Sequence, residues 1–191
     1  MADPAGWRLA ELLWERLAEA GLAAHDVGDT GVAAELWTAA RALAETFDDD
    51  DPRRAATLNN RAVISARTGE ADEAESLYRR ALAGWQAAET WVARMAQAPR
   101  ARSSLFHLRL ERKHRARYDE LARDEHRRRL RAARAVTSAN LAGLTGEGDA
   151  DCDDVGLARW SRERPAGFND ERKLAAAVLL IARAPLGRDD D

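Results

Sequence analysis

Small and apolar residues recur at helical intervals in the first half of the chain, on either side of two glycines. The clearer copy runs from Ala55 to Ala88, with Gly69 near its middle. Because glycine tolerates the left-handed backbone that ends a helix, Gly69 predicts a tight turn between two helices. Small residues let the helix axes approach, and larger apolar residues fill the space around the crossing. In order, these positions are Leu58, Ala62, Gly69, Ala74, Tyr78, Ala81 and Leu82.

A second copy of this pattern lies about forty residues upstream, around Gly28. The residues at matching offsets are Leu17, Gly21, Ala33, Trp37 and Ala40. Residues 14–47 are therefore expected to form a helix pair with the same layout. Between the copies, an acidic loop TFDDDDPRR lengthens the spacing, and Pro52 within it stops the preceding helix.

The two copies resemble the tetratricopeptide repeat, a unit of about 34 residues that folds into paired antiparallel helices. The longer spacing and the string DPRRAATLNNRAV resemble in particular the roughly 42-residue variant of kinesin light chains and of many bacterial signalling proteins. This resemblance implies an all-α fold, a short stacked array whose curved surface binds other proteins. The function implied is a protein-binding module: an adaptor, a scaffold, an assembly factor or a chaperone.

The resemblance also implies which side chains line the concave groove, because the first helix of each pair faces it. These are Asn59, Asn60, Val63, Ala66 and Arg67 in the clearer copy, and Glu19, Leu22, His25 and Asp26 in the other. An asparagine amide both donates and accepts, so Asn60 is the first candidate to hold the backbone of an extended peptide. The alternative is that it bonds a neighbouring helix or water. Arg67 could pair with an acidic ligand, whereas Arg61 stands where the family usually has leucine.

A third copy is visible only in outline beyond Pro99. Where a sound repeat has glycine, an aromatic and a small residue, this segment has Ala116, Glu125 and Arg128. The two charged residues among them are costly to bury unpaired. Residues 102–135 form either a degenerate repeat or one long helix that caps the array, and we favour the long helix. The expected organisation is a repeat array over 1–98, this basic element over 99–144, an acidic linker over 145–168 and a C-terminal helix over 169–185.

The C-terminal helix is expected to begin at Asn169, with acidic residues in its first turn. Its apolar run from Leu174 to Ile181 needs a cover. Either the helix folds back to cap the array, or it pairs with another subunit in a homo-oligomer. Trp37 is expected in the core. Trp85 and Trp91 could receive the next helical layer or a partner's side chain, and we favour the helical layer.

Composition agrees with a small helical protein: 191 residues, 46% of them hydrophobic and 33% charged, with a net charge of −3. The longest apolar stretch, Leu174 to Ala182, is too short to span a bilayer, and the N-terminus lacks a signal-peptide pattern. We therefore expect a cytoplasmic protein without a membrane partner. The single cysteine, Cys152, lies among carboxylates that disfavour its thiolate, so it should be a poor nucleophile.

Charge is distributed unevenly. Residues 100–134 carry 13 basic and 5 acidic side chains, a net charge of +8 between two acidic flanks. Such a stripe could grip the phosphates of a nucleic acid, or lie against acidic segments of this chain or of a protein partner. The nucleic-acid interpretation is the less favoured one. Its candidate residues are Arg109, Arg112, Lys113, Arg127, Arg128 and Arg129.

A weak metal-site candidate lies in the same segment, since His107, Glu111 and His114 share one face of a continuous helix. The Glu111 to His114 spacing is that of carboxylate and imidazole ligands, but no second copy of this motif occurs. A solvated helix face explains the trio more simply. The chain contains no phosphate loop, no Gly-x-Ser-x-Gly elbow, no paired-cysteine motif and no dinucleotide fingerprint. We therefore expect no cofactor and no catalysis.

Overall fold

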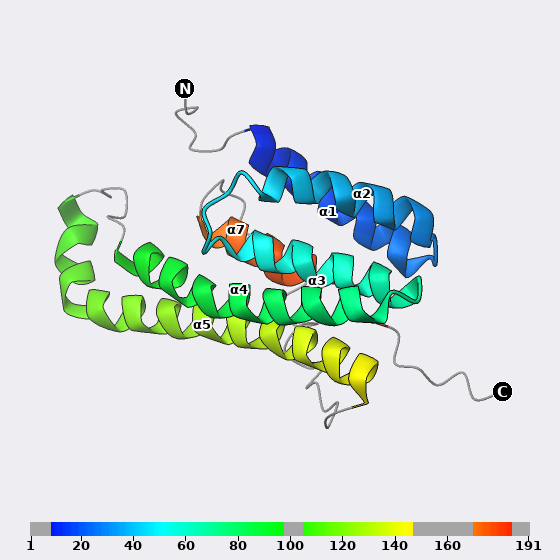
Figure 1. Cartoon of the computed structure of the whole chain (residues 1–191). Helices are drawn as coiled ribbons and strands as arrows, with labels where there is room; N and C mark the ends of the chain where they lie inside the picture. Colours follow the sequence, from blue (N-terminus) through cyan, green and yellow to red (C-terminus); the bar gives the residue numbers. More distant parts are fainter. Residues whose placement is uncertain (1–8, 98–104, 147–169, 185–191) are drawn as a thin grey trace.

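The computed structural model describes residues 9–97, 105–146 and 170–184 (Figure 1). Across these ranges the chain is all-helical, as the sequence predicts, and its helices form an array. The helices are α1 (Leu9–Asp26), α2 (Thr30–Ala44), α3 (Pro52–Arg67), α4 (Ala71–Gln97), α5 (Leu105–Thr145) and α7 (Asp170–Leu179). The prediction for Cys152 and most of the predicted linker over 145–168 concern residues outside the described ranges.

The first four helices form two hairpins, each closed by one of the glycines that the pattern singles out. Gly28 and Gly69 adopt φ values of 83° and 84°, which a side chain at Cβ would oppose. After each glycine the next backbone N–H returns to the end of the preceding helix: Asp29 N donates to Ala24 O at 2.9 Å, and Glu70 N donates to Ser65 O at 2.8 Å. The two predicted helix turns are therefore confirmed.

Small residues bring the paired helices close together. Ala62, Ala74 and Ala81 are fully buried, and Tyr78 fills the space beside them. At Gly21 of α1 a methyl group would lie only 2.4 Å from Nε1 of Trp37 in α2. Trp37 is itself buried, as expected for a core residue.

The acidic loop between α2 and α3 is built around the buried guanidinium of Arg53. This group lies 4.0 Å from the ring centre of Phe47 and donates to Asp51 Oδ2 at 2.6 Å and to Glu11 Oε1 at 3.1 Å. Burial alone would lower the pKa of Arg53, but the hydrogen bonds and charges of Asp51 and Glu11 outweigh it and raise that pKa. Arg94 of α4 adds a bond to Asp50 at 2.7 Å, so the loop ties α1, α3 and α4 together.

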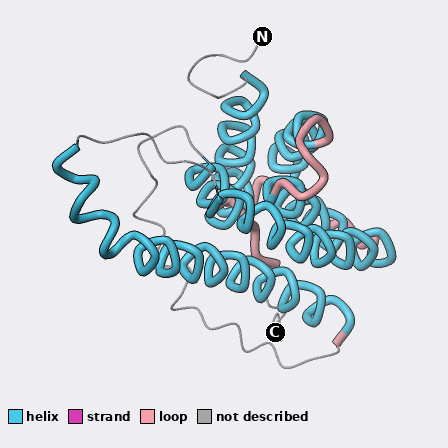
Figure 2. The backbone as a smooth tube through the Cα atoms, turned by 90° about the vertical axis from the view of Figure 1, so that its left-hand side faces the viewer, coloured by secondary structure: helices cyan, strands magenta, loops and turns pink. Residues whose placement is uncertain are grey.

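The segment beyond α4 is one continuous helix, which is the interpretation the sequence analysis favours over a degenerate repeat. Helix α5 runs antiparallel to α4 and along one edge of the assembly (Figures 1 and 2). Leu130, Ala133 and Val136 bury its inner face, and Trp85 Nε1 donates to Thr137 Oγ1 at 3.0 Å. Trp85 thus receives the next helical layer, as expected.

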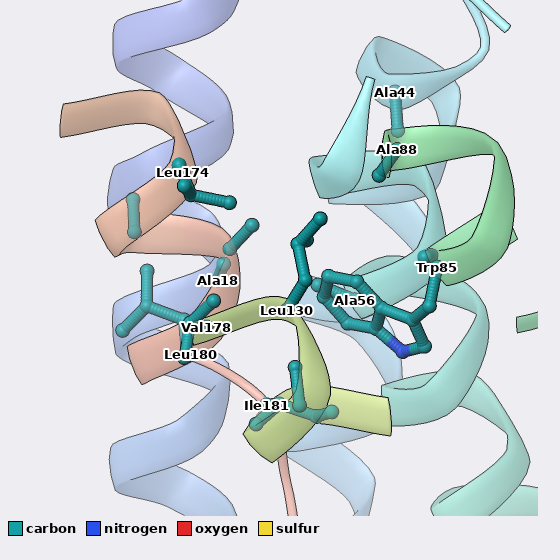
Figure 3. Close-up of a cluster of buried hydrophobic side chains, with 14 of the residues drawn as sticks. Ala18, Ala44, Ala56, Trp85, Ala88, Leu130, Leu174, Val178, Leu180 and Ile181 are labelled. Carbon is teal, nitrogen blue, oxygen red and sulfur yellow. The ribbon is translucent and has the colours of Figure 1, made fainter. Parts of the chain in front are cut away.

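The C-terminal helix folds back onto the array. The apolar run of α7 is covered by α1, α3 and α5 of the same chain, which is the first of the two predicted arrangements. Leu174 and Val178 pack beside Ala18 of α1, Ala56 of α3 and Leu130 of α5 (Figure 3). At the polar edge of α7, Arg172 pairs with Glu15 at 3.0 Å and Lys173 pairs with Glu11 at 3.1 Å.

The close approach at Gly21 gives a stability prediction. We expect Gly21→Ala to lower the free energy of unfolding by about 1–3 kcal/mol, because the added methyl overlaps the Trp37 ring. Gly143→Ala is the matched control, since Gly143 is a helical glycine with open space around its Cβ direction. That variant should be neutral or more stable by up to about 1 kcal/mol. Urea titration followed by circular dichroism measures both, and equal effects of the two changes would contradict the described packing.

Candidate functional site

Two asparagines of α3 bind the chain segment that follows α7. Asn59 and Asn60 are only 0% and 1% exposed. The amide of Asn60 donates through Nδ2 to Leu180 O at 2.7 Å and accepts through Oδ1 from Ala182 N at 2.7 Å. The amide of Asn59 donates through Nδ2 to Ala182 O at 2.8 Å. Both side chains therefore contact backbone atoms of the non-helical segment 180–184.

A third asparagine completes this arrangement from α5. The buried Asn140 donates through Nδ2 to Ala182 O at 3.0 Å and to Asn59 Oδ1 at 3.0 Å. Its Oδ1 accepts from Ala184 N at 2.9 Å. We call Asn59, Asn60 and Asn140 the asparagine cluster. Every amide oxygen and nitrogen in the cluster is hydrogen bonded.

The cluster provides a site for an extended backbone. It bonds residues 180, 182 and 184, and this alternation is the period of an extended chain. A buried non-helical segment cannot satisfy its own N–H and C=O groups, so the amides replace the partners that a neighbouring strand would supply. Asn60, the first candidate to hold an extended peptide of a partner, here binds an extended backbone of its own chain.

Asn140 is a member of the cluster that the sequence did not single out. Its only local signal is an uncharged amide in the largely apolar stretch AVTSANLAGL. Helical periodicity places it on the face of Ala133 and Val136, but nothing nearby in the sequence indicates that α3 lies opposite.

The other predicted groove residues are divided between core and surface. Val63 is fully buried near Ala182, whereas Arg67, one turn further along α3, is exposed. Glu19 lies partly exposed on α1, 3.5 Å from Arg16. His25, another predicted groove residue, is buried: it is 7% exposed, and its ring centre lies 5.6 Å from that of Trp37.

Two other polar side chains, Arg61 and Tyr78, lie close to this core. The partly buried Arg61 pairs with Glu73 of α4 at 3.4 Å. The hydroxyl of Tyr78 has no hydrogen-bond partner among the described residues, and burial raises the pKa of this phenol. Tyr78 therefore stays neutral in the folded protein at physiological pH.

The basic stripe is described only in part. The side chains of Arg109, Arg112 and Lys113 lie outside the described residues. Arg127 is 63% exposed and lies 3.9 Å from Asp124. Glu125 accepts from both Arg128 and Arg129, at 3.0 and 3.3 Å. Acidic neighbours on α5 thus offset part of the positive charge available to a phosphate.

For the three candidate metal ligands, the structure describes only the backbone. His107, Glu111 and His114 all belong to α5, but their side chains lie outside the described residues. Within the described ranges, no three histidine, cysteine or carboxylate side chains are grouped so that they could bind a metal ion. Within the same ranges, every helix is too short or too polar to cross a membrane.

Comparison of the chain with protein-family models, with curated proteins and with solved structures found no match. The features that bear on function are therefore the asparagine cluster and the helices α3 and α5 that position it.

Removing one amide of the cluster should loosen the segment it holds. Asn60→Ala leaves the Leu180 carbonyl and the Ala182 N–H buried without that partner, which should cost about 1–3 kcal/mol of unfolding free energy. Amide hydrogen exchange at Ala182 should accelerate by more than the global loss of stability explains. Asp29→Ala is the matched control, because it removes the N-cap of α2 at a cost of about 1 kcal/mol away from the cluster. Equal acceleration at Ala182 in both variants would contradict the described hydrogen bonds.

Proposed function

We propose that this chain is a non-catalytic protein-binding module, a short tetratricopeptide-like array that holds an extended segment of a partner protein. The observation that carries the proposal is the asparagine cluster with all its amide groups directed at one backbone. Such contacts supply main-chain recognition of the kind used when a peptide adds a strand to a sheet edge. The resemblance of the two hairpins to the repeat family supports the same function.

The chemistry of the site favours binding over catalysis. Asparagine amides do not titrate in the physiological range, so the cluster offers hydrogen bonds and no proton transfer. The walls around it are apolar, with Val63, Leu141 and Leu144 packed near Ala182 and Ala184. A backbone bound in this groove is shielded from water, which strengthens its hydrogen bonds. The role that fits is a cytoplasmic adaptor, assembly factor or chaperone without a cofactor.

Site-specific photocross-linking in the native host tests this proposal. A photoreactive residue in place of the exposed Arg67, at the end of α3 beyond Val63, should cross-link a partner protein. The same residue in place of Arg79 is the control, since Arg79 is also exposed but lies on α4, the second helix of the pair. Mass spectrometry of the adduct should identify one partner segment at position 67 and none at position 79.

Two outcomes would contradict the proposal. Cross-links of equal yield at both positions would indicate random encounters, and cross-links at position 79 alone would move the binding surface to the other side of the array. Nuclease treatment before mass spectrometry distinguishes protein binding from the alternative function, nucleic-acid binding. Recovery of nucleic acid in place of protein, with binding that weakens steeply as salt rises, would assign the function to the arginines of α5.

A further inference from the structure

We infer that segment 180–184 is an internal ligand whose side chains indicate which partner this groove takes: an extended segment with two apolar residues, then one small residue, then a residue that faces solvent. This inference rests on the proposed function. It adds that the partner segment replaces the internal one and does not bind beside it.

The backbone contacts explain why another chain can make the same interaction. The cluster binds Leu180 O, Ala182 N, Ala182 O and Ala184 N, and none of these atoms belongs to a side chain. Any segment that follows the same extended path presents the same groups at the same spacing. Main-chain recognition of this kind gives affinity without fixing the sequence.

Burial of the side chains restricts which segments fit. Leu180 and Ile181 are buried in the core that α7 shares with α1 and α3. Ala182 is 0% exposed and lies among Val63, Trp37 and Tyr78, so its site accepts only a small residue. Arg183 is exposed, so the core does not confine its side chain.

The hydrogen bonds of the asparagine cluster require that a partner segment replace the internal one. Each amide oxygen and nitrogen of the three asparagines is already bonded, so a second backbone cannot join while the internal segment is present. An empty groove would leave three buried amides without partners, which is unfavourable. The groove is therefore occupied in both states, first by residues 180–184 and then by the partner.

Attachment within one chain gives the internal segment an advantage. A tethered ligand acts at an effective concentration on the order of millimolar. The ion pairs of Arg172 and Lys173 with Glu15 and Glu11 add to its retention through α7. A free peptide of the same sequence should therefore bind weakly until the internal segment is displaced.

The test uses the full chain and a fluorescent synthetic peptide with the sequence of residues 170–184, DERKLAAAVLLIARA. Ala182→Arg in the chain should expel its own segment, because the new side chain has no room and no partner for its charge. Fluorescence anisotropy should then show at least ~10-fold tighter binding of the peptide than to the unaltered chain. Arg183→Lys is the matched control and should bind the peptide as weakly as the unaltered chain does.

A folded Ala182→Arg chain that binds the peptide no better than the control would overturn the inference, and so would equal binding of a peptide carrying the same Ala-to-Arg change. If that variant does not fold, hydrogen exchange on the unaltered chain tests whether the peptide displaces the internal segment. Excess unlabelled peptide should accelerate exchange in the chain's own residues 174–184, and unchanged exchange at a peptide concentration on the order of millimolar would contradict displacement. A partner that cross-links at position 67 without changing this exchange would refute displacement while leaving the proposed function intact.

Discussion

A buried stretch of non-helical backbone inside a helical protein must find hydrogen-bond partners outside itself, and the structure depends on how this chain supplies them. Helices satisfy their own main-chain groups, but residues 180–184 cannot. Asn59, Asn60 and Asn140 provide the missing donors and acceptors from two helices that are far apart in sequence. Because these amides are themselves buried, the segment and the cluster each require the other.

The remaining architecture holds the helices of this arrangement in place. The two glycine turns set the hairpins, and Trp85 fixes α5 against α4 through Thr137, which brings Asn140 opposite α3. The Arg53 network joins α1 to the start of α3 through Glu11, and Glu11 also binds Lys173 of α7. Glu11 thus links the first helices of the array to the C-terminal helix.

Local spacing was sufficient to predict the helix hairpins, because turn glycines and small crossing residues act within one repeat. It also indicated that Asn60 is suited to hold a backbone. It could not show that the backbone lies some 120 residues further along the same chain, nor that Asn140 joins it, because no short-range periodicity encodes the pairing of distant elements. The burial of His25 was not evident for the same reason, since it depends on Trp37 of the next helix, whose ring lies beside it.

Nuclear Overhauser measurements on the isotope-labelled full chain test the central claim most directly. The account predicts contacts from the side-chain amide protons of Asn59, Asn60 and Asn140 to the backbone of Leu180, Ala182 and Ala184, together with slow exchange of the Ala182 amide. Absence of these contacts, with residues 170–184 at random-coil chemical shifts, would show that the C-terminal segment does not occupy the groove and would contradict the account.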